Sequence, residues 1–136
     1  MNASEIMTID PVFVDAAATT ADVIERLLEL DVRHLPVMDK GQLIGMISDR
    51  DLRELSGFVP TDPRSVQAHR DTLDAPIANH LRGGALSVDT EEDLGTIVDL
   101  MIDHKIGAVP VVSQHEGTLV GIISTIDVLR AARDIL

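Results

Sequence analysis

Hydrophobic and polar residues follow the same order in two separate parts of the chain. In residues 33–51, two short apolar runs flank the turn-forming residues 39–41, which predicts two β-strands joined by a tight turn. The second run leads into residues 48–52, where a serine followed by acids indicates the start of a helix. The same order returns in residues 107–127. The pattern therefore predicts two copies of one strand–turn–strand–helix unit.

The duplication extends upstream of the strands. Residues 15–36 align without a gap on residues 89–110 at a constant offset of 74. Within the first stretch, a cap at Thr19 or Thr20 precedes apolar residues at i, i+1, i+4 and i+5 spacing, which predicts a helix to about Leu30. Each copy then reads strand–helix–strand–strand–helix. We therefore expect an α/β (α+β) fold of two pseudo-symmetric units, because each sheet face is too small to cover itself.

The boundaries of the copies follow from composition. Residues 1–57 form the first copy and residues 76–136 the second. The intervening residues 58–75 contain prolines, mixed charges and weak periodicity, which indicates a linker with one helical turn.

Composition excludes several classes of protein. Lysines and arginines number 11 against 23 acids, and only 1% of the 136 residues are aromatic. A net charge of -12 disfavours nucleic acid and anionic membranes as partners. Without cysteine, disulfides, thiolate catalysis and cysteine-based zinc sites are ruled out. No window approaches the roughly 20 apolar residues of a membrane span, and the N-terminus lacks signal-peptide features. We expect a cytoplasmic location.

The junction between second strand and helix carries the candidate chemistry. Ser48 lies where unpaired helix amides favour phosphate, and Asp51 lies near the same opening. A carboxylate at this place can accept both hydroxyls of a ribose. The alternative is a capping box, which any helix can use. Because Ser124 and Asp127 repeat the arrangement after another glycine and apolar pair, binding is the favoured interpretation.

Catalytic and metal sites are not predicted. Nucleophile-elbow, Walker A and Rossmann glycine patterns do not occur, so the sequence indicates no enzyme, no catalytic residues and no required cofactor. The five histidines lack the i, i+4 spacing of a helical metal site. The acids in residues 89–93 leave a magnesium sensor open, although acids at a helix start are favoured by the dipole alone.

The chain resembles the CBS domain family in its paired form, the Bateman module. The resemblance is carried by RHLPVMD and GMISDRDL in the first copy and by GAVPVV and GIISTIDVL in the second. It implies a β-α-β-β-α unit per copy, two units packed sheet to sheet about a pseudo-twofold axis, and up to two adenosine-type sites between them. It also implies a homodimer of modules.

The resemblance further implies which residues form the two sites, built crosswise between the copies. In the first site, Asp51 would bind the ribose and Ser48 would face the phosphate, with Arg33 and Arg50 nearby. The adenine would contact residues of the second copy, namely Ile106, Gly107 and Ala108. The second site would use Asp127 and Ser124 and would borrow Val32, His34 and Thr8. The basic residues predict that the first site handles phosphate better.

The leading hypothesis is a regulatory module that senses adenine nucleotides of the AMP, ADP or ATP type. S-adenosylmethionine is an alternative ligand. A different class of function is a ligand-free dimerisation module that docks onto a partner protein. The sequence does not specify the regulated protein.

Overall fold

The structure is a computed structural model that describes residues 1–56, 63–81 and 86–136. It contains two β-sheets and several helices, so the predicted mixed α/β class is confirmed. The chain divides into two compact units. The first-repeat unit comprises Phe13–Lys40 and Ile44–Gly84, and the second-repeat unit comprises Met1–Val12, Gly41–Leu43 and Ala85–Leu136. The predicted domain boundary at residues 57 and 58 lies outside the described residues.

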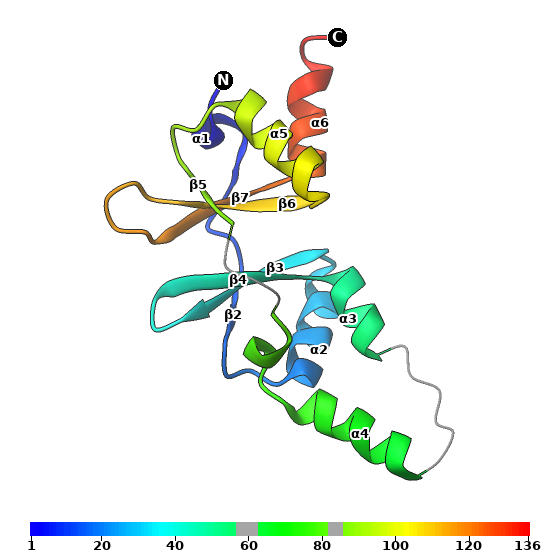
Figure 1. Ribbon diagram of the computed structural model, residues 1–136. Helices are drawn as coiled ribbons and strands as arrows, with labels where there is room; N and C mark the ends of the chain where they lie inside the picture. Colours follow the sequence, from blue (N-terminus) through cyan, green and yellow to red (C-terminus); the bar gives the residue numbers. More distant parts are fainter. Residues whose placement is uncertain (57–62, 82–85) are drawn as a thin grey trace. The chain divides into compact units, whose positions relative to one another are not determined.

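A three-stranded sheet forms the centre of the first-repeat unit, in the order β2-β3-β4. Strand β2 pairs in parallel with β3, which places Val14 opposite Val37. The predicted turn lies between β3 and β4, where Lys40 and Gly41 adopt φ values of 51° and 80°. Helices α2 and α3 lie on one side of this sheet (Figure 1). The elements are β2 (Val14–Asp15), α2 (Thr20–Leu30), β3 (His34–Asp39), β4 (Gln42–Ser48) and α3 (Asp49–Ser56).

The second-repeat unit has the same plan with one additional strand. Its sheet has the order β1-β7-β6-β5, in which β6 and β7 are antiparallel and β5 is parallel to β6. Helices α5 and α6 lie together on one side of it (Figure 1). The elements are α1 (Ala3–Ile6), β1 (Thr8–Ile9), β5 (Val88–Asp89), α5 (Leu94–His104), β6 (Ala108–Val112), β7 (Leu119–Ser124) and α6 (Thr125–Arg133).

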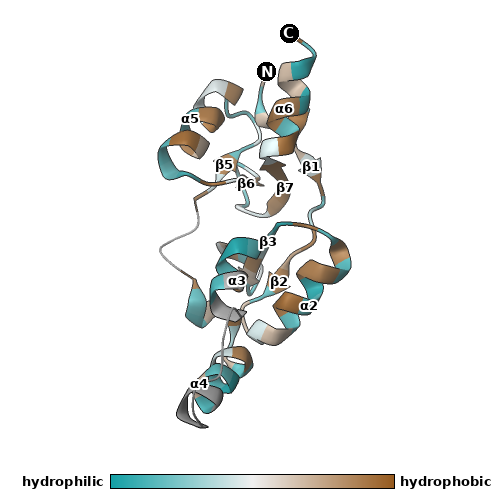
Figure 2. Ribbon diagram, turned by 90° about the vertical axis from the view of Figure 1, so that its right-hand side faces the viewer, coloured by the Kyte–Doolittle hydropathy of each residue, from teal (hydrophilic) through white to brown (hydrophobic). Residues whose placement is uncertain are grey.

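Local sequence explains why α2 and α5 form where they do. The Thr19 side chain caps α2 by accepting a hydrogen bond from the backbone N–H of Asp22 at 3.1 Å, which confirms one of the two predicted caps. The buried residues Val23 and Leu27 belong to the predicted apolar stripe. Hydrophobic and hydrophilic residues are interleaved along both helices (Figure 2). Helix α5 repeats the plan with Asp93 as its cap.

Each unit is completed by the segment that precedes the other copy. The N–H of Ala3 donates to the carbonyl of Glu92 at 2.9 Å, and the N–H of Ile77 donates to the carbonyl of Ala18 at 2.8 Å. These two bonds are equivalent under the offset of 74, as are α1 and the short 3-10 helix η1 (Ile77–His80). Ala3 and Ile77 are fully buried in the two aliphatic cores. The two segments therefore exchange places reciprocally.

The linker is more regular than the sequence predicts. Helix α4 (Pro63–Asp74) has 12 residues, so the prediction of a single helical turn in the linker is wrong. Pro63 stands at the first helical position, where its missing N–H and fixed φ are compatible with a helix. The apolar residues of α4 show only weak helical periodicity, so the sequence pattern did not predict this helix.

Within the described ranges, none of the helices has the length and apolar character needed to span a membrane.

Two glycines allow the exchanged segments to lie against the sheets. At Gly45 the absence of a side chain leaves room for the Leu81 side chain, which approaches it. At the equivalent Gly121, a Cβ would lie 2.5 Å from Sδ of Met7 and 3.0 Å from the backbone carbonyl oxygen of Thr8. A Cβ at Gly45 would meet only the two methyl groups of Leu81, at 3.0 and 3.2 Å, and its Cγ. The space at Gly121 is thus bounded partly by backbone.

We predict that Gly121→Ala lowers the free energy of unfolding by about 1–3 kcal/mol, as overpacking of a well-packed site does. Gly45→Ala is the matched control and should cost less, because the end of the Leu81 side chain can move. Urea unfolding of both variants measures the difference. A Gly121→Ala, Met7→Ala double variant should regain part of the loss relative to Met7→Ala alone. Equal losses at the two glycines would contradict this account.

Candidate functional site

The junction between β4 and α3 is held by a reciprocal pair of hydrogen bonds. The N–H of Ser48 donates to Oδ2 of Asp51 at 3.0 Å, and the N–H of Asp51 donates to Oγ of Ser48 at 3.1 Å. This is the geometry of a capping box, so the alternative interpretation of the motif describes its structural role correctly. Asp51 is nevertheless exposed, and within the described part of the chain its Oδ1 has no hydrogen-bond partner. One carboxylate oxygen therefore remains available.

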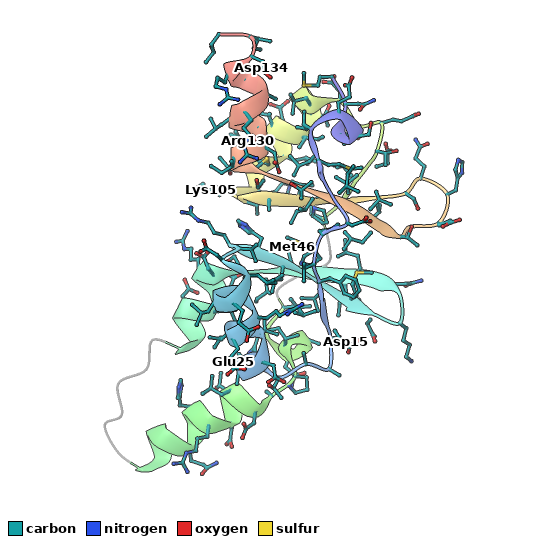
Figure 3. The ribbon with its side chains drawn as sticks, turned by 180° about the vertical axis from the view of Figure 1, so that it is seen from behind. Asp15, Glu25, Met46, Lys105, Arg130 and Asp134 are labelled. Atoms are coloured by element: carbon teal, nitrogen blue, oxygen red, sulfur yellow. The ribbon has the colours of Figure 1, made fainter. Side chains whose placement is uncertain are left out.

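The equivalent junction between β7 and α6 is more completely bonded. Asp127 Oδ2 accepts hydrogen bonds from the N–H of Ser124 at 2.8 Å and from its Oγ at 3.0 Å. Oδ1 accepts a long hydrogen bond from Oγ1 of Thr8 at 3.5 Å and lies 3.8 Å from Nη1 of Arg130 on α6 (Figure 3). The Asp127 side chain is buried, with 8% of the residue exposed. Both of its oxygens are engaged within its own unit.

In each unit the segment before the first long strand is tied to the start of the helix. The N–H of Asp49 donates to the carbonyl of Arg33 at 2.8 Å, and the N–H of Thr125 donates to the carbonyl of Gly107 at 3.0 Å. These amides and the capping amide of Asp51 are therefore already bonded, although the sequence predicted unpaired amides for phosphate. Each bond joins a segment to the helix start of its own unit, whereas the prediction assigned each segment to the site of the other copy.

The remaining predicted residues differ in exposure. Arg33 and Arg50 are exposed, as is Val32, while His34 and Ile106 are half-buried and Ala108 is buried. The structure places Oγ1 of Thr8 3.5 Å from Oδ1 of Asp127, within one unit, and a role for Thr8 in ligand binding stays a prediction. The other crosswise partners, in which residues of one unit complete the site of the other, remain predictions.

The imidazole of His34 is shifted toward its neutral form. Burial lowers the pKa of His34 below its ordinary value of 6.5, and the carboxylates of Asp49 and Asp51 oppose that shift. The guanidinium of Arg33 adds to the lowering. The charged groups that shift the pKa of His34 therefore lie around the β4–α3 junction, which also contains Ser48.

A pocket of about 520 Å³ lies beside Asp51 within the first-repeat unit. This volume falls in the range of small-molecule sites. Its walls come from β4, α3 and the segment around η1: Met46, Ile47, Asp51, Glu54, Asn79, His80 and Leu81. Sequence reasoning missed Glu54, Asn79 and His80 as site residues. Extending the offset of 74 back to residue 3 would have indicated the exchanged segment, because it matches residues 77–81 to residues 3–7.

The acids near residue 89 have structural partners. Oδ1 of Asp89 accepts a hydrogen bond from the N–H of Glu91 at 2.8 Å, and Asp93 caps α5 by accepting from the N–H of Gly95 at 2.9 Å. In the described ranges, no three histidine, aspartate or glutamate side chains are grouped so that they could hold a metal ion.

Comparison with curated proteins finds relatives of different lengths. The A-adding tRNA nucleotidyltransferase of Aquifex aeolicus is 28% identical over 135 residues, which are 96% of this chain and 14% of that enzyme. The hypoxic response protein 1 of Mycobacterium tuberculosis is 27% identical over 129 residues, which are 94% of this chain and 82% of the relative. The chain thus spans a small part of the first protein and most of the second.

Solved structures give the same fold over nearly the whole chain. The structure of CBSX2 in complex with AMP is 27% identical, with a TM-score of 0.81, and the match covers 98% of this chain and 97% of that one. The structure of hypoxic response protein I with two coordinated zinc ions is 25% identical, with a TM-score of 0.75 and coverage of 96% and 98%.

The family model for the CBS domain matches twice, at residues 3–57 and 81–134. The two matches correspond to the two copies that the repeat defines, and together they cover most of the chain. The duplicated strand–helix junction, the two similar sheets and the matching solved structures agree with this result. The chain belongs to the CBS domain family as a pair of CBS domains.

Proposed function

We propose that this chain is a regulatory module that binds adenine nucleotides and has no catalytic role. The observation that carries the proposal is the Asp51 carboxylate, which keeps Oδ1 available and lines a pocket of about 520 Å³. Ribose hydroxyls are donors that a carboxylate accepts, as in dinucleotide-binding folds. The AMP complex of CBSX2, a structure 27% identical to this chain, supports AMP as the first ligand to test.

The proposed first site uses Asp51 for the ribose and Ser48 with Arg33 and Arg50 toward phosphate. Arg33 and Arg50 are exposed, so their side chains can reach a bound anion.

The proposed second site uses Asp127 and Ser124 with Thr8. A ligand there would have to replace the hydrogen bonds that Ser124 and Thr8 make to the Asp127 carboxylate. Asp51 keeps one oxygen available, so we expect the first site to bind more tightly than the second. Occupancy would regulate a partner only if the ligand binds two arrangements of the protein with different affinity.

A second candidate function is a ligand-free module that dimerises and docks onto a partner protein. The capping boxes alone account for both Ser–Asp pairs. Leu28 on α2 and Ile102 on α5 occupy equivalent positions and are 76% and 65% exposed, which is unusual for large apolar side chains and fits a homodimer surface. This function requires no small molecule.

Thermal unfolding separates the two functions. With AMP at 100 times its dissociation constant, we expect stabilisation of about 2.7 kcal/mol, because a ligand that binds only the folded state must raise its stability. ADP, ATP and S-adenosylmethionine belong in the same series. A melting temperature that responds to none of these compounds would favour the ligand-free module.

Replacing Asp51 should weaken AMP binding selectively. We predict that Asp51→Asn raises the dissociation constant about 10- to 100-fold, since a hydrogen bond to a charged group contributes about 1.5–3 kcal/mol. Calorimetric titration measures the dissociation constant, with Asp39→Asn as the control for losing an exposed carboxylate in the same unit. In contrast to Asp51→Asn, the Asp127→Asn substitution should chiefly lower the melting temperature, because the Asp127 side chain is buried and hydrogen-bonded. Unchanged AMP affinity in Asp51→Asn would refute the assignment of this site.

A further inference from the structure

Helices α3 and α6 begin at the two Ser–Asp junctions, and the residue one helical turn after the aspartate has a different charge in each helix. Arg130 stands three residues after Asp127, and its Nη1 lies 3.8 Å from the carboxylate. Glu54 stands three residues after Asp51, at the equivalent place on α3. The second junction therefore has a neutralising partner for its aspartate, and the first has a second negative charge instead.

Glu54 and Asp51 line the same pocket. The other lining side chains are apolar, apart from Asn79 and His80, so no lysine or arginine contributes to the described wall. Neither Asp51 nor Glu54 forms an ion pair with any residue in the described ranges. Arg33 and Arg50, on which the expectation of phosphate binding rested, are not among the lining residues. The wall of the pocket is thus acidic.

An acidic wall acts differently on ligands that share the same nucleoside. Hydroxyl and amino groups donate hydrogen bonds that carboxylates accept, so adenosine meets no electrostatic penalty. Each added phosphate charge is repelled by both carboxylates. Because Asp51 and Glu54 are exposed, water and salt weaken this repulsion, which is therefore strongest at low ionic strength. The net charge of -12 adds a further, longer-range repulsion.

We propose that Glu54 is a specificity-determining residue that makes the Asp51 pocket select adenosine-type ligands with few phosphate charges. This inference rests on the proposed function, because it assigns a charge preference to the same site. It reverses the preference for phosphate that Arg33 and Arg50 suggest from sequence. Glu54 acts through its charge, so its effect should appear in the ratio of affinities rather than in the affinity for the nucleoside itself.

Calorimetric titration with adenosine, AMP and ATP tests the inference at low salt and with EDTA, since magnesium would mask the charge of ATP. Wild-type protein should bind adenosine and AMP more tightly than ATP. In Glu54→Gln we expect the ATP affinity, relative to adenosine, to rise about five- to tenfold, and in Glu54→Arg to rise further. The difference should shrink in high salt, because exposed charges are screened.

Glu116→Gln is the matched control, because it removes one exposed negative charge from the other unit and changes the net charge equally. It should leave the affinity ratio unchanged. If the compounds bind but the ratio is the same in wild type and Glu54→Gln, the inference is overturned while the proposed function stands. A wild type that prefers ATP would overturn it as well. If none of the three compounds binds, the proposed function fails, and the inference fails with it.

Discussion

Backbone hydrogen bonds between segments that are distant in sequence hold each unit together, and the rest of the structure depends on them. Ala3 pairs with Glu92, and Ile77 pairs with Ala18. Both donors belong to short helical segments, and the side chains of Ala3 and Ile77 are themselves fully buried, so the same two residues close the backbone and complete the core. The exchanged segments lie against the sheets at Gly45 and Gly121, where a larger side chain would meet them. The pocket beside Asp51 also owes part of its wall to this packing.

Strong local patterns made part of this fold predictable from sequence. Helix α2, the turn at Lys40–Gly41 and the second copy follow from apolar spacing, a capping threonine and a constant offset. Helices α1 and α4 were not predicted. Helix α1 has four residues, too few to show a period, and α4 lacks a strong apolar stripe. Their positions are set by tertiary packing, which local pattern does not contain.

The candidate site divides in the same way between local and distant causes. The Ser–Asp pairs were found from spacing, and their capping geometry is local. What distinguishes the two junctions comes partly from elsewhere in the chain, because Thr8 reaches Asp127 across 119 residues. The pocket walls at Asn79 and His80 come from the first residues of the predicted second copy, which pack in the unit of the first copy. Two motifs that look alike in sequence can therefore differ in charge, burial and free oxygens.

The reciprocal exchange of segments has a consequence for how the chain folds and how it could evolve. Neither half of the chain, cut between the copies, contains all the parts of one unit, since Met1–Val12 belongs with Ala85–Leu136. Strand β1 cannot pair with β7 until nearly the whole polypeptide has been synthesised, because Thr8 pairs with Ile122. Such long-range pairing slows folding through the entropy of loop closure. A single copy separated from the other would lack the segment that completes its sheet and core here.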